Sequence, residues 1–156
     1  MNKNYISLSL WIVLLIAIGS IIGTLTKPEI STWYTTLNRS ALTPPNYVFP
    51  IAWTILYTLI AICGWLIWLH PSREQLRFVK ILYVIQLILN WIWSPLFFNY
   101  HLTGTSLLVV SFIDILVGIL ICLTYPKIRP VSLLMIPYLL WILFASYLNF
   151  YIWWYN

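Results

Sequence analysis

The sequence predicts an all-α membrane protein, a bundle of five transmembrane helices whose long first loop acts as a lid. Two observations predict this fold. Hydrophobic residues make up 62% of the 156 residues, charged residues make up only 7%, and the mean hydropathy is +0.92. Such a composition suits lipid better than water. The apolar residues also form separate runs, each close to the roughly 20 residues that cross a bilayer.

These runs predict helices over residues 6–25, 48–69, 78–98, 106–125 and 131–154 of a single domain. The first run is longer than the roughly 7–15 apolar residues of a cleaved signal peptide, so we expect it to remain as a span. Pro44 and Pro45 precede the second helix, while Pro71 and Pro126 follow the second and fourth. A proline at a helix start does no harm because its missing amide donor would be unpaired there anyway.

Lys and Arg are distributed unequally between the two sides of the predicted bundle. The side of the N-terminus holds Lys3, Arg73, Arg77, Lys80, Lys127 and Arg129. The other side holds Lys27 and Arg39. Because cytoplasmic connections carry the excess of positive charge, we expect a cytoplasmic N-terminus and an exterior C-terminus. The net charge of +5 does not indicate a nucleic-acid partner, since no stripe of basic residues could follow a phosphate backbone.

Several kinds of chemistry are disfavoured by the residues available. Cys63 and Cys122 fall inside apolar runs, where cysteine acts as a small hydrophobic residue rather than part of a disulfide framework. His70 and His101 lie at loop ends, and the sequence places no further metal-ligating residue at the spacing that a metal site needs, so we expect no metal site. The sequence has no phosphate-binding Gly-rich loop, no nucleophile elbow and no paired carboxylates. We therefore expect no required cofactor and no ordinary hydrolytic or phosphoryl-transfer activity.

Residues 26–47 form the long connection between the first two predicted helices. This segment contains Trp33, Tyr34, Pro44 and Pro45, whereas a solvated linker is rich in Gly, Ser and charged residues. We expect it to pack on the exterior end of the bundle as a lid. The alternative is an aromatic anchor at the membrane interface.

The last four predicted helices each carry a stripe of polar, aromatic and small residues spaced three or four apart, which places each stripe on one helical face. Lipid offers polar groups no partner, so the stripes are expected to face inward. The stripes are Trp53, Tyr57, Ala61 and Gly64; Gln86, Asn90, Trp93 and Phe97; Ser111, Asp114, Gly118 and Cys122; and Tyr138, Trp141, Ala145 and Asn149.

Some of these stripe residues lie at a similar depth below the expected lid. They are Trp53, Tyr57, Asn90, Trp93, Trp141 and Ala145. Aromatic walls with a few hydrogen-bonding groups predict a ligand-binding cavity. The alternative is an aromatic core with an interfacial girdle.

Asp114 is the one acid inside a predicted span. A carboxylate at mid-membrane costs about 2.5–3.5 kcal/mol on insertion scales, which makes it a candidate proton carrier or ligand contact. The alternative is a protonated Asp114 that is hydrogen-bonded to a neighbouring helix, with Gln86 or Asn90 as partner. Gly19 and Gly23 form a GxxxG pattern, which fits either a dimer seam or packing within the bundle.

Three ordered motifs resemble those of the translocator proteins, also called tryptophan-rich sensory proteins or peripheral-type benzodiazepine receptors. The first joins Trp33-Tyr34-x-x-Leu37 to Pro44-Pro45-x-x-x-Phe49-Pro50-x-x-Trp53-x-x-Leu56-Tyr57. The second is Gln86-x-x-x-Asn90-Trp91-x-Trp93-x-Pro95-x-Phe97-Phe98. The third is Pro137-Tyr138-x-x-Trp141-x-x-Phe144-Ala145-x-x-Leu148-Asn149. The resemblance covers essentially the whole chain.

This resemblance implies a five-helix bundle, often a homodimer, that binds porphyrins, sterols and benzodiazepine-type ligands under its first loop. Trp53 and Trp141 match two tryptophans associated with porphyrin breakdown in some bacterial members. Asn90 and Ala145 match cavity-lining positions, and Asp114 matches a recurrent acid. Animal members carry a proposed cholesterol-recognition motif at the end of the fifth helix, but here no Lys or Arg follows Leu148. The resemblance therefore favours a bacterial cell membrane.

The leading functional hypothesis is a binding and sensory protein for tetrapyrroles and similar apolar ligands, stacked on Trp53 and Trp141 and oriented by Tyr57 and Asn90. A second hypothesis is light- and oxygen-dependent porphyrin degradation supported by the same two tryptophans. A third is porphyrin transport, with Asp114 cycling a proton. A scaffold that works through the Gly19–Gly23 face is the remaining alternative.

Overall fold

The computed structural model describes residues 2–71 and 76–156, and these residues form helices and connections without a strand. The helices are α1 (Asn2–Ser31), α2 (Trp33–Thr36), α3 (Val48–Leu69), α4 (Arg77–Phe98), α5 (Thr103–Thr124) and α6 (Arg129–Tyr155). Within the described ranges, five of these are long and apolar enough to cross a membrane, all except α2. The prediction of an all-α membrane protein with five spans is confirmed.

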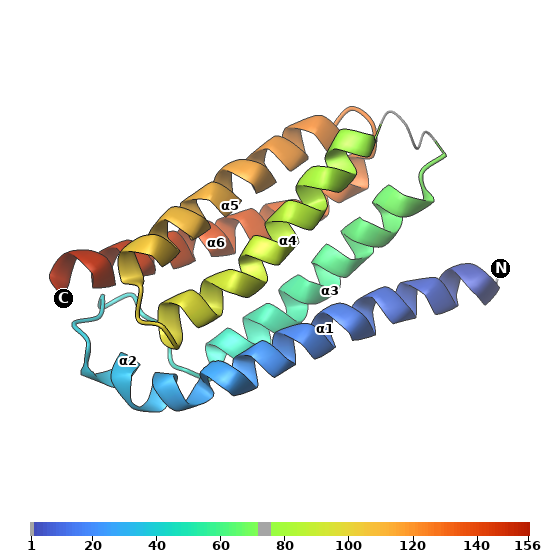
Figure 1. Ribbon diagram of the computed structural model, residues 1–156. Helices are drawn as coiled ribbons and strands as arrows, with labels where there is room; N and C mark the ends of the chain where they lie inside the picture. The colour runs from blue at the N-terminus through green and yellow to red at the C-terminus, as the bar shows by residue number, and fades with distance from the viewer. Residues whose placement is uncertain (1, 72–75) are drawn as a thin grey trace.

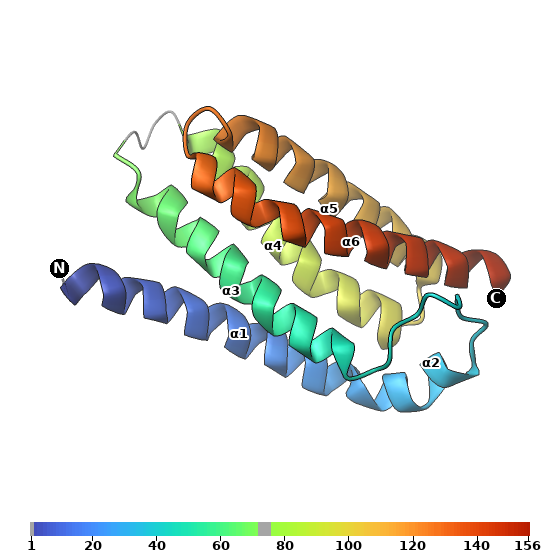
Figure 2. The same ribbon diagram turned by 180° about the vertical axis from the view of Figure 1, so that it is seen from behind.

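The five long helices pack as a closed ring in the order α1, α3, α6, α5, α4 and back to α1. The two views in Figures 1 and 2 show the helices running side by side, with the N- and C-termini at opposite ends of the bundle. The short helix α2 and the loop that follows it lie at the end that holds the C-terminus. This end is where residues from distant parts of the sequence meet.

The interior of the ring is filled by large side chains from α3, α4 and α6, including the fully buried Ile60, Tyr83 and Tyr138. Leu and Ile residues such as Ile55, Ile88 and Leu140 point outward. This is the arrangement expected in lipid, because the outward face needs apolar side chains and the helix interfaces need close packing and hydrogen bonds.

Glycines allow α1 to lie close to its neighbours. A Cβ atom added at Gly19 would overlap the Tyr57 ring of α3, whereas one added at Gly23 would meet nothing within 4 Å. A Cβ atom at Gly64 would crowd the rings of Tyr83 and Trp11. Of the two glycines of the GxxxG pattern, Gly19 therefore serves packing within the bundle.

The first helix is longer than the sequence predicted. It continues six residues beyond residue 25, through Pro28, to Ser31. Hydroxyl groups in this stretch bond back to the helix: Oγ1 of Thr26 donates to the carbonyl of Ile22 at 3.0 Å, and Oγ of Ser31 donates to the carbonyl of Pro28 at 2.9 Å. Pro28 interrupts the amide ladder but does not end the helix. The remaining connection is α2 and the α2–α3 loop, residues 37–47. Arg73, used in the orientation prediction, lies outside the described residues.

Candidate ligand-binding site

The α2–α3 loop is held against the end of α6 by hydrogen bonds. The amide N–H of Asn38 donates to Oδ1 of Asn156 at 2.9 Å, and Nδ2 of Asn156 donates to the carbonyl of Asn38 at 3.2 Å. Ser40 is buried, and its hydroxyl lies 2.8 Å from the hydroxyl of Tyr147. The loop is therefore held at two points, Tyr147 within α6 and Asn156 directly after its last residue.

Helix α2 packs on the aromatic end of α4. Tyr34, only 4% exposed, contacts the rings of Phe97 and Phe98 edge-on, with centroids 6.2 and 5.5 Å apart. Trp33 contacts Phe97 and stacks on His101 of the α4–α5 turn, with centroids 4.0 Å apart. The predicted lid residues Trp33 and Tyr34 are thus part of a small aromatic core under the loop.

A second contact joins the α4–α5 turn to the end of α1. Nε2 of His101 lies 3.1 Å from Oε2 of Glu29. His101 has a positive φ of 55°, a conformation that residues with a side chain seldom adopt. The stack on Trp33 and the contact with Glu29 together hold this turn against α1 and α2.

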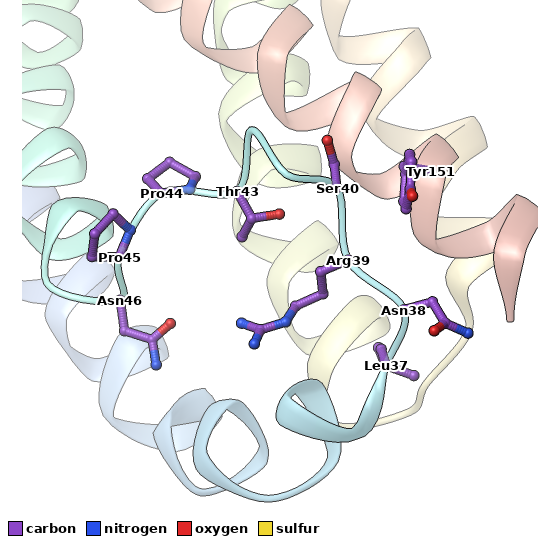
Figure 3. Close-up of a pocket in the computed structure, with 9 residues that line it drawn as sticks. All are labelled: Leu37, Asn38, Arg39, Ser40, Thr43, Pro44, Pro45, Asn46 and Tyr151. Atoms are coloured by element: carbon purple, nitrogen blue, oxygen red, sulfur yellow. The ribbon is translucent and has the colours of Figure 1, made fainter.

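A pocket of about 530 Å³ opens at the α2–α3 loop, a size typical of small-molecule sites. Its lining, drawn in Figure 3, is Leu37, Asn38, Arg39, Ser40, Thr43, Pro44, Pro45, Asn46 and Tyr151. The side chains of Arg39 and Thr43 point into the space that the loop encloses. Of the four predicted lid residues, Pro44 and Pro45 line this pocket, while Trp33 and Tyr34 lie outside the lining and Tyr34 contacts Arg39 of the lining.

Arg39 supplies the positive charge of this pocket. Its guanidinium carbon lies 5.2 Å from the centroid of the Tyr34 ring, a cation–π distance. Burial raises the pKa of the Tyr34 phenol above its usual value, although the charge of Arg39 acts in the opposite direction. The phenol is therefore neutral near pH 7 and contributes no negative charge that would offset Arg39.

Below the loop, the interior of the ring contains a chain of hydrogen bonds between three helices. The hydroxyl of Tyr57 donates to Oδ1 of Asn90 at 2.8 Å, and Nδ2 of Asn90 donates to the hydroxyl of Tyr138 at 3.2 Å. Tyr138 in turn donates to Oε1 of Gln86 at 2.9 Å. The sequence placed Tyr57, Asn90 and Gln86 on inward faces; here Asn90 and Gln86 bond to the buried Tyr138 of α6, and Tyr57 bonds to Asn90.

The three predicted cavity tryptophans are half-buried and have separate neighbours. Trp53 lies against the Tyr57 ring at 5.4 Å, and Trp141 lies against Phe49 at 6.1 Å. Nε1 of Trp93 donates to Oδ1 of Asn149 at 3.1 Å. All three indoles pack against the buried core instead of standing free in lipid.

The predicted cavity residues differ from the residues that line the observed pocket. Trp53, Tyr57, Asn90, Trp93, Trp141 and Ala145 are absent from the lining of the loop pocket. Ala145, like the three tryptophans, is half-buried. The structure brings Trp53, Tyr57 and Asn90 into contact, but Trp93 and Trp141 bind to other neighbours.

The stripe predicted on the fourth span does not face the interior as expected. The buried face of α5 is instead formed by Ser106, Val110, Ile113, Leu116, Val117, Leu120 and Thr124. Ser111, Asp114 and Gly118 are half-buried and Cys122 is exposed. The apolar face turns inward because it packs between α4 and α6, which leaves the polar stripe at the margin of the helix.

Asp114 has a partner that the sequence reasoning did not name. Oγ of Ser146 on α6 donates to its Oδ2 at 2.6 Å, while Oδ1 is buried and has no partner among the described residues. The expected partners Gln86 and Asn90 are bonded to Tyr138 instead. Asp114 is therefore linked to the neighbouring helix, as one alternative supposed, but through a serine.

Sequence reasoning missed the residues that hold the loop in place. Tyr147 recurs with Tyr151 and Tyr155 at a spacing of four, a periodicity that could have marked one face of α6. No such signal marks Asn156 or Asn38, because their pairing depends on the fold. Within the described residues, no group of three His, Cys, Asp or Glu side chains could hold a metal ion.

Comparison with known proteins agrees with this architecture. Residues 11–155 match the model of the TspO/MBR family. The chain is 39% identical to the tryptophan-rich protein TspO of Archaeoglobus fulgidus, over 94% of this chain and 95% of the relative. It is 35% identical to the protein of the same name from Chlorobaculum tepidum, over 96% of both, and 30% identical to the translocator protein of Bos taurus, over 90% and 85%. The chain belongs to the TspO/MBR family of membrane proteins.

Proposed function

We propose that this protein binds tetrapyrroles, and flat apolar molecules such as sterols or benzodiazepine-type compounds, at the end of the bundle that the α2–α3 loop covers. The observation that carries the proposal is the open pocket of about 530 Å³ lined mainly by a loop that is bonded to α6 and to Asn156 directly after it. Aromatic side chains lie directly beneath this loop. Such a site offers both a mouth that can open and apolar surfaces for a planar ligand.

In this proposal the loop acts as a lid. Opening it requires the bonds of Asn38 and Ser40 to α6 to break, and these are hydrogen bonds of modest net strength at the edge of the molecule. A planar ligand that extends from the pocket into the bundle would then stack on Trp53 and Trp141. These indoles do not line the pocket itself; they are half-buried and are held by Tyr57 and Phe49. The amide of Asn90 would orient polar atoms of the ligand.

Titration with protoporphyrin in neutral detergent tests this function. Saturable changes in porphyrin absorbance are expected with the unmodified protein, and Trp141→Ala and Trp53→Phe should each weaken binding severalfold. Trp154→Phe is the matched control, because Trp154 is 64% exposed on the same helix as Trp141. Unchanged affinity in both Trp53→Phe and Trp141→Ala would contradict the proposed site.

Porphyrin degradation is the second candidate function. Because we propose no bound redox cofactor, the porphyrin itself would absorb light and activate oxygen, and Trp53 and Trp141 are the indoles proposed to take part. Illumination of the purified protein with protoporphyrin under air distinguishes the two functions. Product that forms at the same rate in Trp53→Phe would exclude a specific role for that indole.

The orientation and assembly of the protein are also part of the proposal. Six basic residues against two favour a cytoplasmic N-terminus in a bacterial cell membrane. Gly19 lies directly against the Tyr57 ring of the same chain, which argues against that glycine as part of a dimer interface, so a homodimer would use another face. A reporter fused to each terminus tests the orientation, since only the N-terminal fusion should be active as a cytoplasmic enzyme.

A further inference from the structure

The pocket at the α2–α3 loop has a polar character that a purely apolar ligand would not use. Arg39 is the one charged residue in its lining. Five further residues carry neutral hydrogen-bonding side chains: Asn38, Ser40, Thr43, Asn46 and Tyr151. A polar mouth with a single cation favours a ligand that has an anionic edge.

No carboxylate of the described residues neutralises the charge of Arg39. Of the two acidic side chains within the described residues, Glu29 contacts His101 and Asp114 accepts from Ser146. No ion pair to Arg39 is formed within the described part of the chain, where the Glu29–His101 pair is the one present. Tyr34 lies beneath the guanidinium and steadies it without neutralising it.

The backbone on both sides of Arg39 is fixed. Asn38, directly before it, is bonded to Asn156 through its amide and its carbonyl. Ser40, directly after it, is bonded to Tyr147. A cation whose backbone is already held binds an anion with less loss of conformational entropy than one on a free loop.

We propose that Arg39 binds a carboxylate of the ligand and so selects acidic tetrapyrroles over neutral ones. The planar guanidinium matches the two oxygens of a carboxylate and forms charge-assisted hydrogen bonds with it. The amide of Asn46 lies in the same lining and offers a further donor. This inference rests on the proposed function, and it adds the part of the ligand that the mouth of the pocket recognises.

Titrations with protoporphyrin IX and with its dimethyl ester test the inference, because the two probes share a ring and differ in charge. The protein in neutral detergent should bind the dicarboxylate roughly tenfold or more tightly than the ester, the range expected of a charged hydrogen bond. Arg39→Gln should reduce this preference to near unity and leave the affinity for the ester unchanged. Arg39→Lys should retain part of it, since it keeps the charge but loses the bidentate geometry.

Lys27→Gln is the control, because Lys27 is an exposed cation at the same end of the bundle and does not line the pocket. It should keep the preference of the unmodified protein. Equal affinity for both probes in the unmodified protein, or an unchanged preference in Arg39→Gln, would overturn the role of Arg39 while leaving the proposed function intact. Failure of both probes to bind saturably would overturn the proposed function and this inference together. The melting temperature of each variant shows whether it has folded.

Discussion

Asn156 holds the backbone of Asn38 on both sides, since its Oδ1 accepts the amide N–H at 2.9 Å and its Nδ2 donates to the carbonyl at 3.2 Å. One side chain thereby satisfies both backbone hydrogen-bonding groups of Asn38. It connects the α2–α3 loop to the end of α6 across 118 positions of sequence. Mobility of the loop should therefore depend on this residue.

Asn156→Ala is expected to loosen the loop without unfolding the bundle. The variant removes the acceptor and the donor that hold Asn38, each with a net contribution of about 0.5–1.5 kcal/mol. Hydrogen–deuterium exchange of residues 37–40 should accelerate several-fold, while exchange in α3 stays the same. Asn156→Asp keeps the acceptor and should give an intermediate rate. Equal rates in all three proteins would show that the loop is held elsewhere.

Asn90→Leu is expected to destabilise the bundle by about 1–3 kcal/mol. The substitution removes the acceptor of Tyr57 and the donor to Tyr138, which leaves two buried hydroxyl groups short of partners. Denaturation in detergent measures the loss. Ile88→Leu on the lipid-facing side of the same helix is the control and should change the stability little. A loss of stability no larger than that of the control would contradict a structural role for these hydrogen bonds.

The two glycines of the GxxxG pattern should respond differently to alanine. A methyl group at Gly19 overlaps the ring of Tyr57, so Gly19→Ala should cost about 1–3 kcal/mol of stability as an overpacked contact. Gly23→Ala meets open space and should be neutral or stabilising by up to about 1 kcal/mol, because alanine favours the helix. Thermal unfolding compares them. Equal effects on stability would contradict the packing role of Gly19. Loss of a dimer in either variant would indicate that the GxxxG pattern forms an interface between copies of the chain.

His101 is expected to stabilise the connection between α4 and α5 despite its backbone conformation. His101→Ala removes the stack on Trp33 and the contact with Glu29, and it leaves a residue with a side chain at φ 55°. His101→Gly removes the same contacts but tolerates that φ. The alanine variant should therefore unfold at lower denaturant than the glycine variant, by roughly 1 kcal/mol. Equal midpoints would mean that the backbone is not strained there.

The five spans could be predicted from sequence because lipid permits few alternatives. A run of apolar residues long enough to cross the bilayer must form a helix that satisfies its own backbone. The ends of the helices were harder to predict. Helix α1 continues past Pro28 to Ser31, and the hydroxyl groups of Thr26 and Ser31 bond to its carbonyls one turn earlier, although the same residues are typical of loops.

The site could be predicted in part. Spacing placed Tyr57 and Asn90 on inward faces, and the structure joins them by a hydrogen bond of 2.8 Å. Spacing could not show which face of α5 is inward. Both the apolar face that contains Ile113 and the polar face that contains Asp114 have helical periodicity, and either could pack against α4 and α6. Contacts such as Asn38 with Asn156 join segments that meet only after folding, and no local pattern encodes them.

Hydrogen–deuterium exchange with protoporphyrin IX tests most directly where the ligand binds. At saturating porphyrin, the amides of residues 37–43 and of Asn46 should become protected, because the ligand fills the pocket that this loop lines and holds the loop against α6. Protection confined to lipid-facing surfaces, or an unchanged exchange rate in the loop while porphyrin is bound, would contradict a binding site under the α2–α3 loop.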